Sequence, residues 1–113
     1  MEKRQEIEIT EKTKGIIVVA KSPNENNNGF ILLIDKVEPV KILGDDDLLI
    51  YSHVMLSIDM DLDFSFLDNR WGYTKRYGYK FYEPTEEDIN KVKNCIRKRG
   101  LKYIKGINKL IRR

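Results

Sequence analysis

The chain has 113 residues, of which 41% are hydrophobic and 35% charged, with 21 basic and 18 acidic side chains. This length corresponds to a single domain over residues 1–113, and no apolar run approaches the ~20 residues that a membrane-spanning helix needs. One Cys, one His and a charged N-terminus exclude a disulfide framework, a zinc site of several such residues and a secretory signal, so we expect a cytoplasmic protein.

The first third of the chain predicts strands. Residues 5–13 alternate polar and apolar side chains, which is typical of a half-buried strand. Residues 15–22 and 30–37 are short runs rich in β-branched and aliphatic side chains, which predict buried strands. The polar residues 23–29 between them are rich in Asn and end in Gly, so the two strands are expected to form a β-hairpin.

Further along, Pro39 and the acidic turn predicted at Gly44–Asp47 bracket a short strand at 40–43, and residues 48–54 predict another. From Ile58 to Phe66 the side chains again alternate. A strand there would place five apolar side chains on one face and three carboxylates on the other.

Those three carboxylates, at Asp59, Asp61 and Asp63, have the spacing of the first ligands in an EF-hand loop. Such a loop also needs Gly and Glu further on, where this chain has Phe64 and Arg70. We therefore predict a strand with a polar outer face and no metal site.

A catalytic group is not expected. Ser52 and His53 are neighbours on a predicted strand, where adjacent side chains point to opposite faces, so they do not form a nucleophile and its base. Cys95 lies beside the apolar stripe of a predicted helix, and we expect it to be a small core residue. There is no Gly-rich phosphate loop, so we predict a protein that is not an enzyme and has no cofactor.

A turn is predicted at 68–70, and residues 70–82 then combine six of the eleven aromatic residues with four cations. Aromatic rings interleaved with cations are typical of proteins that bind single-stranded nucleic acid, because the rings stack on bases and the charges contact phosphates. The alternative is a β-hairpin whose odd-numbered aromatic residues form the core, with Tyr82 and the cations outside.

A helix is predicted over residues 86–99. Thr85 is a suitable N-cap with Asp88 three residues later, and the first turn is acidic, which the helix dipole favours. Gly100 suits the left-handed C-terminal cap. One apolar stripe, which we expect to pack on the sheet, contains Ile89, Val92 and Ile96.

Two alternatives fit the tail, residues 101–113. Its apolar residues fit helical spacing, although Gly106 interrupts it, and a hairpin turning through 105–108 fits the pattern equally well. The charge of this end is unambiguous: residues 91–113 contain ten basic residues and no acidic one. This predicts a basic face that attracts anions, or alternatively a solvated helix face with a basic tail.

The segment from Lys80 to Leu110 resembles a short module in small proteins of gut-bacterial phages and mobile elements, for which no activity is known. There an aromatic residue and a Pro/Ala-Thr-Glu-Glu sequence start a helix, which ends at a Gly followed by an aromatic residue and a Leu. The corresponding positions here are Phe81, Pro84–Glu87, Gly100, Tyr103 and Leu110, with Tyr103 where the module tends to have Trp.

Residues 40–54, VKILGDDDLLIYSHV, resemble a companion segment of those proteins. The resemblance covers residues 37–113. It implies a helix followed by a β-hairpin and a bacterial host, and it implies no activity.

Together these patterns predict an α+β domain: an antiparallel sheet or partly open barrel over residues 5–82, then one principal helix and a short basic hairpin within residues 84–113. For its function we predict a small phage or mobile-element protein that binds nucleic acid and has no membrane partner. The alternatives are a module that inhibits or adapts a host protein, or a small virion component, with the oligomeric state left open. The predicted nucleic-acid-binding residues are Arg70, Lys75, Arg76, Tyr82, Lys98, Arg99, Lys102 and Lys105.

Overall fold

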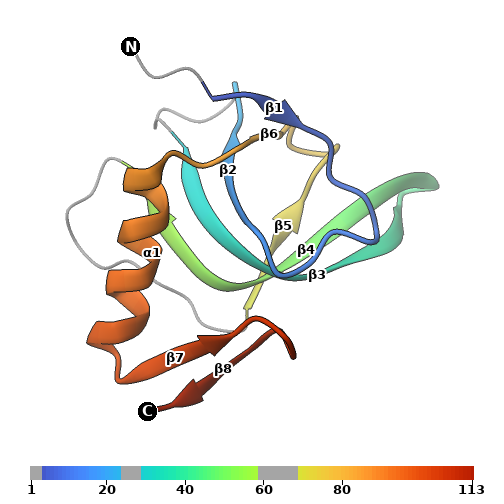
Figure 1. The fold of residues 1–113 in the computed structure, drawn as a ribbon. Helices are drawn as coiled ribbons and strands as arrows, with labels where there is room; N and C mark the ends of the chain where they lie inside the picture. Colours follow the sequence, from blue (N-terminus) through green and yellow to red (C-terminus); the bar gives the residue numbers. More distant parts are fainter. Residues whose placement is uncertain (1–3, 24–28, 59–68) are drawn as a thin grey trace.

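The computed structural model describes residues 4–23, 29–58 and 69–113. Six strands form an antiparallel sheet in the order β1-β6-β2-β3-β4-β5, and β7 and β8 form a separate hairpin (Figure 1). One helix, α1, lies against one face of the sheet. The bounds of the elements are β1 Glu6–Ile7, β2 Ile17–Lys21, β3 Phe30–Ile42, β4 Asp45–Ser57, β5 Asn69–Tyr73, β6 Lys80–Tyr82, α1 Glu86–Lys98, β7 Leu101–Ile104 and β8 Lys109–Arg112.

The six-stranded sheet is strongly curled. Trp71 of β5 lies 4.4 Å from Tyr79 and 6.2 Å from Phe81 between ring centroids, although three strands separate β5 from β6 in the sheet. The two sides of the sheet therefore approach each other around an inner core, as in a barrel, and β1 and β5 are the two ends of the sheet among the described strands.

The strand β2 and the first part of β3 are buried on both faces because a second core covers the outer face of the sheet. Val18 and Leu32 belong to the inner core, whereas Val19 and Ile31 pack with Val92 of the helix in the outer core. This double burial explains why both segments are nearly continuous apolar runs rather than alternating ones.

The first predicted strand, 5–13, is much shorter in the structure. Only Glu6 and Ile7 pair, with Tyr82 and Phe81 of β6. Beyond them, Thr13 donates its N–H to the Thr10 carbonyl at 3.0 Å, which forms a turn and ends the strand. Local side-chain bonds of Thr thus outweighed the alternating pattern.

The prediction of two strands at 30–37 and 40–43 was wrong, because β3 runs continuously through Pro39. Pro39 lies opposite Leu48 and past the last residue of β3 that pairs with β2. Hydrogen-bonded and non-hydrogen-bonded pairs alternate from the Ile42–Asp45 pair beside the turn, and the Pro39–Leu48 pair is of the second kind. The missing N–H of Pro39 therefore removes no hydrogen bond between β3 and β4.

The turn predicted at Gly44–Asp47 is correct only at Gly44, because Asp45, Asp46 and Asp47 begin β4. The turn consists of Leu43 and Gly44, whose φ values of 52° and 89° suit a two-residue type I′ turn. The turn predicted at 68–70 fails likewise at Asn69 and Arg70, which belong to β5. The acidic alternation at residues 59–66, with Asp59, Asp61 and Asp63, lies outside the described residues.

Asp47 organises the loop after β5 instead of forming a turn. Its buried carboxylate accepts hydrogen bonds from the Thr74 hydroxyl at 3.1 Å and from the N–H groups of Lys75 and Arg76 at 2.8 and 2.9 Å. Burial alone would raise the pKa of Asp47, but these bonds hold it below its ordinary value.

The helix agrees with the prediction to within one residue. Thr85 and Asp88 form a reciprocal capping box, Arg99 is the C-cap, and Gly100 adopts a φ of 70°. The Arg4 guanidinium contacts the Asp88 carboxylate at 3.0 Å. Burial would raise the pKa of Asp88, but Arg4 and the Thr85 N–H hold it below its usual range.

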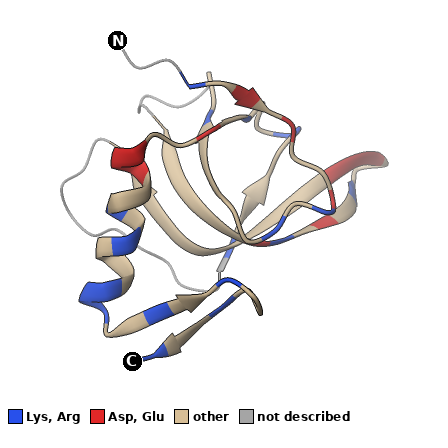
Figure 2. Ribbon diagram, viewed as in Figure 1, with Lys and Arg blue, Asp and Glu red and all other residues tan. Residues whose placement is uncertain are grey.

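The predicted packing of the helix is confirmed for the residues at its centre. Val92 and Ile96 are buried in the outer core, and Cys95 is a buried free thiol beside them. Of the two alternatives for the tail, the structure has the hairpin: β7 and β8 are joined by a turn at 105–108. Figure 2 shows the Lys and Arg residues gathered on the lower part of α1 and on this hairpin.

Candidate binding groove between the helix and the hairpin

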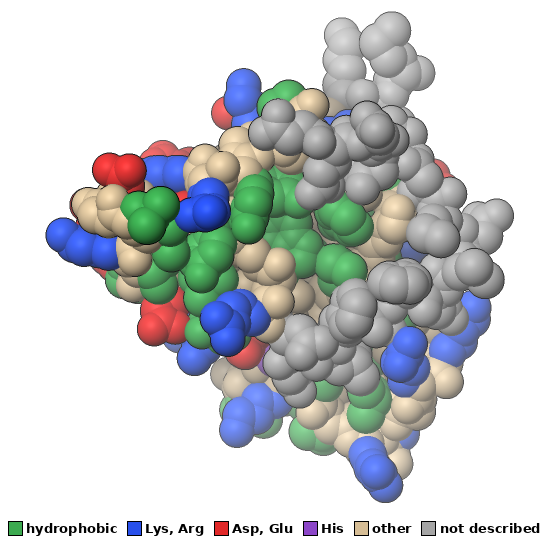
Figure 3. All heavy atoms as spheres, turned by 180° about the vertical axis from the view of Figure 1, so that it is seen from behind, with side chains coloured by type: hydrophobic (Ala, Val, Ile, Leu, Met, Phe, Trp, Pro, Cys, Tyr) green, Lys and Arg blue, Asp and Glu red, His purple; other side chains and the backbone are tan. Residues whose placement is uncertain are grey.

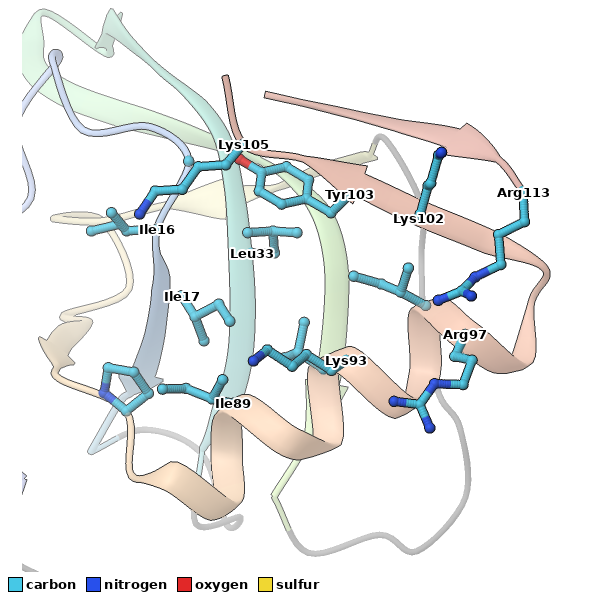
Figure 4. Close-up of a pocket in the computed structure, with 14 residues that line it drawn as sticks. Ile16, Ile17, Leu33, Ile89, Lys93, Arg97, Lys102, Tyr103, Lys105 and Arg113 are labelled. Atoms are coloured by element: carbon cyan, nitrogen blue, oxygen red, sulfur yellow. The ribbon is translucent and has the colours of Figure 1, made fainter. Parts of the chain in front are cut away.

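A groove of about 650 Å³ lies between α1, the β7–β8 hairpin and the beginning of β2 (Figure 4). Much of its surface is apolar and comes from four parts of the chain, through Ile16, Ile17, Leu33, Ile89, Val92 and Tyr103. We call it the basic groove, because five cations also line it. These rim cations are Lys93, Arg97, Lys102, Lys105 and Arg113.

The helix supplies one wall because its apolar stripe is only partly covered. Val92 and Ile96 of this stripe are buried against the sheet, whereas Ile89, nearer the N-terminus of the helix, is half-buried and lines the groove. Lys93 and Arg97 are four residues apart, so they lie one above the other along the same flank of the helix. In Figure 4, Lys93 extends across the apolar part of the groove from this wall.

The hairpin supplies the opposite wall and is anchored by Asn108. Its side-chain N–H donates to the Asp35 carbonyl at 2.7 Å, and its Oδ1 accepts from the Tyr103 hydroxyl at 2.6 Å and lies 3.1 Å from His53 Nε2. His53 is buried and also lies 3.5 Å from the Asp35 carboxylate. This network fixes the hairpin, and therefore Lys102 and Lys105, relative to the sheet.

Tyr103 belongs to both the anchor and the groove. Its ring lies 5.8 Å from the His53 ring, and a Cβ built on Gly15 would lie 3.1 Å from its hydroxyl oxygen. Burial, and the nearby Asp35 carboxylate, raise the pKa of the Tyr103 hydroxyl, which therefore remains a neutral hydrogen-bond donor at physiological pH.

The electrostatics of the groove are one-sided. Among the described residues that line it, there is no Asp or Glu. The ion pairs of the described residues involve Arg4, Lys41, His53 and Lys91, and none of them includes a rim cation. Arg113 donates a hydrogen bond from its Nε to the Leu101 carbonyl at 3.0 Å. An anion with apolar parts is the ligand that such a groove suits.

The predicted nucleic-acid-binding residues do not form one surface. Lys102 and Lys105 line the groove, and Lys98 and Arg99 are exposed at the adjoining end of the helix. The loop with Lys75 and Arg76 lies at the opposite end of the sheet from the hairpin (Figure 1). Asp47, near the beginning of β4, holds this loop, so Lys75 and Arg76 do not lie beside Lys102 and Lys105.

The two other predicted residues are set in the sheet. Arg70 lies on β5, opposite Tyr51 of β4. Tyr82, expected outside, is partly buried against the outer core, and the Lys21 ammonium lies 5.8 Å from its ring centroid.

The aromatic residues of 70–82 pack mainly against one another. The rings of Trp71, Tyr77, Tyr79 and Phe81 form a chain of contacts with centroid distances of 4.4 to 6.4 Å, which favours the alternative of a core-forming pattern. Tyr77 remains 46% exposed. Seen from behind, hydrophobic side chains gather in the middle of the molecule, and Lys and Arg are scattered around them (Figure 3).

The sequence interpretation missed the residues that make the groove: the rim cations Lys93, Arg97 and Arg113, and the apolar Ile16, Ile17 and Ile89 as a ligand-facing set. One signal was readable, namely the i, i+4 spacing of Lys93 and Arg97 beside the apolar stripe. Within the described ranges, no cluster of three or more His, Cys, Asp or Glu could hold a metal ion.

No protein-family model, curated protein or solved structure matches this chain. In the part that the structure describes, no helix is long and apolar enough to cross a membrane.

Proposed function

We propose that this domain is a non-enzymatic binding module that holds an acidic segment of a partner protein in the basic groove. The observation that carries the proposal is that the described residues lining the groove combine an apolar surface with five cations and include no Asp or Glu. The apolar lining suits aliphatic side chains, and the cations suit the carboxylates of the same segment. A module that binds a host protein was one of the alternatives from the sequence, and the basic groove is the surface on which we propose that it binds.

Nucleic acid remains the competing ligand, and the geometry supports it less. Single-stranded nucleic acid is bound by cations together with exposed aromatic faces on which bases stack. The groove lining is aliphatic apart from Tyr103, whose hydroxyl is bonded to Asn108. The aromatic residues of 70–82 lie on other strands and contact one another.

We also infer that this strand-rich domain belongs to the α+β class. The helix and the hairpin follow the strands of the sheet in the chain rather than alternating with them, which is the arrangement of that class.

A charge-reversal pair with a matched control tests the proposal. The probe is a short fluorescent peptide that alternates Glu with Val and Leu, and its affinity is measured by anisotropy. Lys93→Glu with Arg97→Glu reverses two rim cations, whereas Lys109→Glu with Arg112→Glu makes the same change in net charge on exposed residues of β8 outside the groove.

We expect the rim pair to weaken peptide binding at least tenfold, which is about 1.4 kcal/mol, and the control pair to weaken it little. A single-stranded DNA oligonucleotide serves as the second probe. Nucleic acid is the ligand, and the proposal is wrong, if three results are found together. The DNA binds with a steep salt dependence, the peptide does not bind, and both charge-reversal pairs weaken DNA binding equally.

A further inference from the structure

We propose that the acidic segment binds in the extended conformation, as a strand added to the edge of β2 at Ile17. This inference rests on the proposed function of the basic groove and specifies the kind of segment that the groove accepts. It follows from the directions of the backbone groups in β2 and from the residue that stands where β6 ends.

The backbone of Ile17 points away from β3. The Ile34 N–H donates to the Ile16 carbonyl, and Ile17 and Val18 then pair with Leu33 and Leu32. Because successive residues of a strand direct their N–H and C=O groups to opposite sides, Ile16 and Val18 bond to β3. Ile17 therefore directs both groups to the side on which Val19 pairs with Tyr82 of β6.

On that side the ladder stops at a proline. The register of Val19 with Tyr82 and Lys21 with Lys80 would place Pro84 opposite Ile17. Proline has no N–H to donate to the Ile17 carbonyl, and the chain leaves the sheet there to enter the helix at Thr85. Among the described residues, the Ile17 backbone has no hydrogen-bond partner on this side.

This unpaired edge opens into the basic groove, because Ile17 and Pro84 both line it. A strand added there would place every second side chain against the apolar surface near Ile17 and Ile89. The same side chains would face Lys93 and Lys105, because the helix and the hairpin that carry these cations cover the outer face of the sheet, to which Ile17 also points (Figure 4). A helix has no free N–H and C=O groups along its length, so it could not use this edge. The expected partner is an extended segment that contains both acidic and aliphatic residues.

The first measurement is amide hydrogen exchange of the whole protein, with and without the Glu–Val–Leu peptide. In the free protein the Ile17 amide should exchange much faster than those of Val18 and Val19, which are in the ladders. Bound peptide should slow the exchange of Ile17 at least tenfold, because its N–H then donates to the added strand.

The second measurement uses a proline substitution and its match. Pro84→Ala supplies an N–H opposite Ile17, so β6 can extend by one pair and close the edge. We expect it to weaken peptide binding about tenfold, the effect of one to two net hydrogen bonds. Pro39→Ala, on the exposed far part of β3, should leave the affinity unchanged.

The outcomes separate the two proposals. Strand addition is wrong, although the groove is the site, if reversing Lys93 and Arg97 weakens peptide binding but two other results are negative. In that case bound peptide does not slow the amide exchange of Ile17, and Pro84→Ala binds the peptide as tightly as the wild type. If the peptide does not bind, the proposed function fails and this inference fails with it. If binding is accompanied by association of two copies of the chain in sedimentation, an external partner strand is not needed, and the inference is also overturned.

Discussion

The inner and outer faces of the curled sheet are built from the same strands but are covered in different ways. The inner face is filled by the sheet itself, since Trp71 reaches across to Tyr79 and Phe81. The outer face is covered by one helix and one hairpin, which leave the basic groove between them. A face that closes on itself becomes core, whereas a face covered by two separate elements leaves a gap that can bind a ligand.

The charges follow the same division. Cations on the strand side are paired or scattered, as with Lys41 beside Asp46 at 3.9 Å on the exposed hairpin tip. The rim cations line a groove that has no Asp or Glu among its described lining residues. The difference predicts that mutations in the outer core reduce stability strongly, mutations in the hairpin anchor moderately, and mutations of the rim cations little.

The largest effect is expected from Val92→Asp. Val92 is 1% exposed between the helix and the sheet, so an aspartate there would be a buried charge without a partner. We expect a loss of roughly 3–5 kcal/mol in the free energy of unfolding, measured by urea denaturation. Asn94→Asp, an exposed position two residues away, is the matched control and should be nearly neutral. If Val92→Asp unfolds at the same urea concentration as the wild type, the helix does not hold the outer face.

An intermediate effect is expected from Asn108→Ala, which removes the anchor of the hairpin. Three contacts are lost, to the Asp35 carbonyl, the Tyr103 hydroxyl and His53. Alanine is also strained at the φ of 49° that Asn108 adopts. We expect a loss of about 2 kcal/mol, with faster amide exchange in β7 and β8 than in β3.

Asn108→Gly separates the two causes, because glycine accepts the positive φ but makes none of the side-chain bonds. It should recover about 1 kcal/mol of the loss and leave the hairpin amides exposed to exchange. An equal rise in exchange throughout the sheet would contradict a local anchor.

The helix could be predicted almost to the residue because its signals are local: a cap at Thr85, an acidic first turn and a glycine at 100. The groove could not be predicted, since it requires residues near Ile17, Lys93 and Lys105 to meet, and their meeting depends on the curl of the sheet. The role of the aromatic residues of 70–82 could not be predicted for a related reason. Rings alternating with cations look the same in sequence whether they stack on bases or on one another, and only the position of Trp71 relative to Tyr79 decides between them.

The smallest effect on stability is expected from Lys93→Gln and Lys102→Gln, which remove two rim cations from opposite walls of the groove. Both side chains are exposed, and neither forms an ion pair within the described part of the chain. The free energy of unfolding should therefore change by less than about 0.5 kcal/mol. At low salt the change should be toward higher stability, because the remaining like charges repel less, and added salt should abolish it. A loss above about 1 kcal/mol would mean that these cations hold the fold together. A neutral result, combined with weaker peptide binding, would mean that the fold does not need them and that their role is to bind an acidic partner.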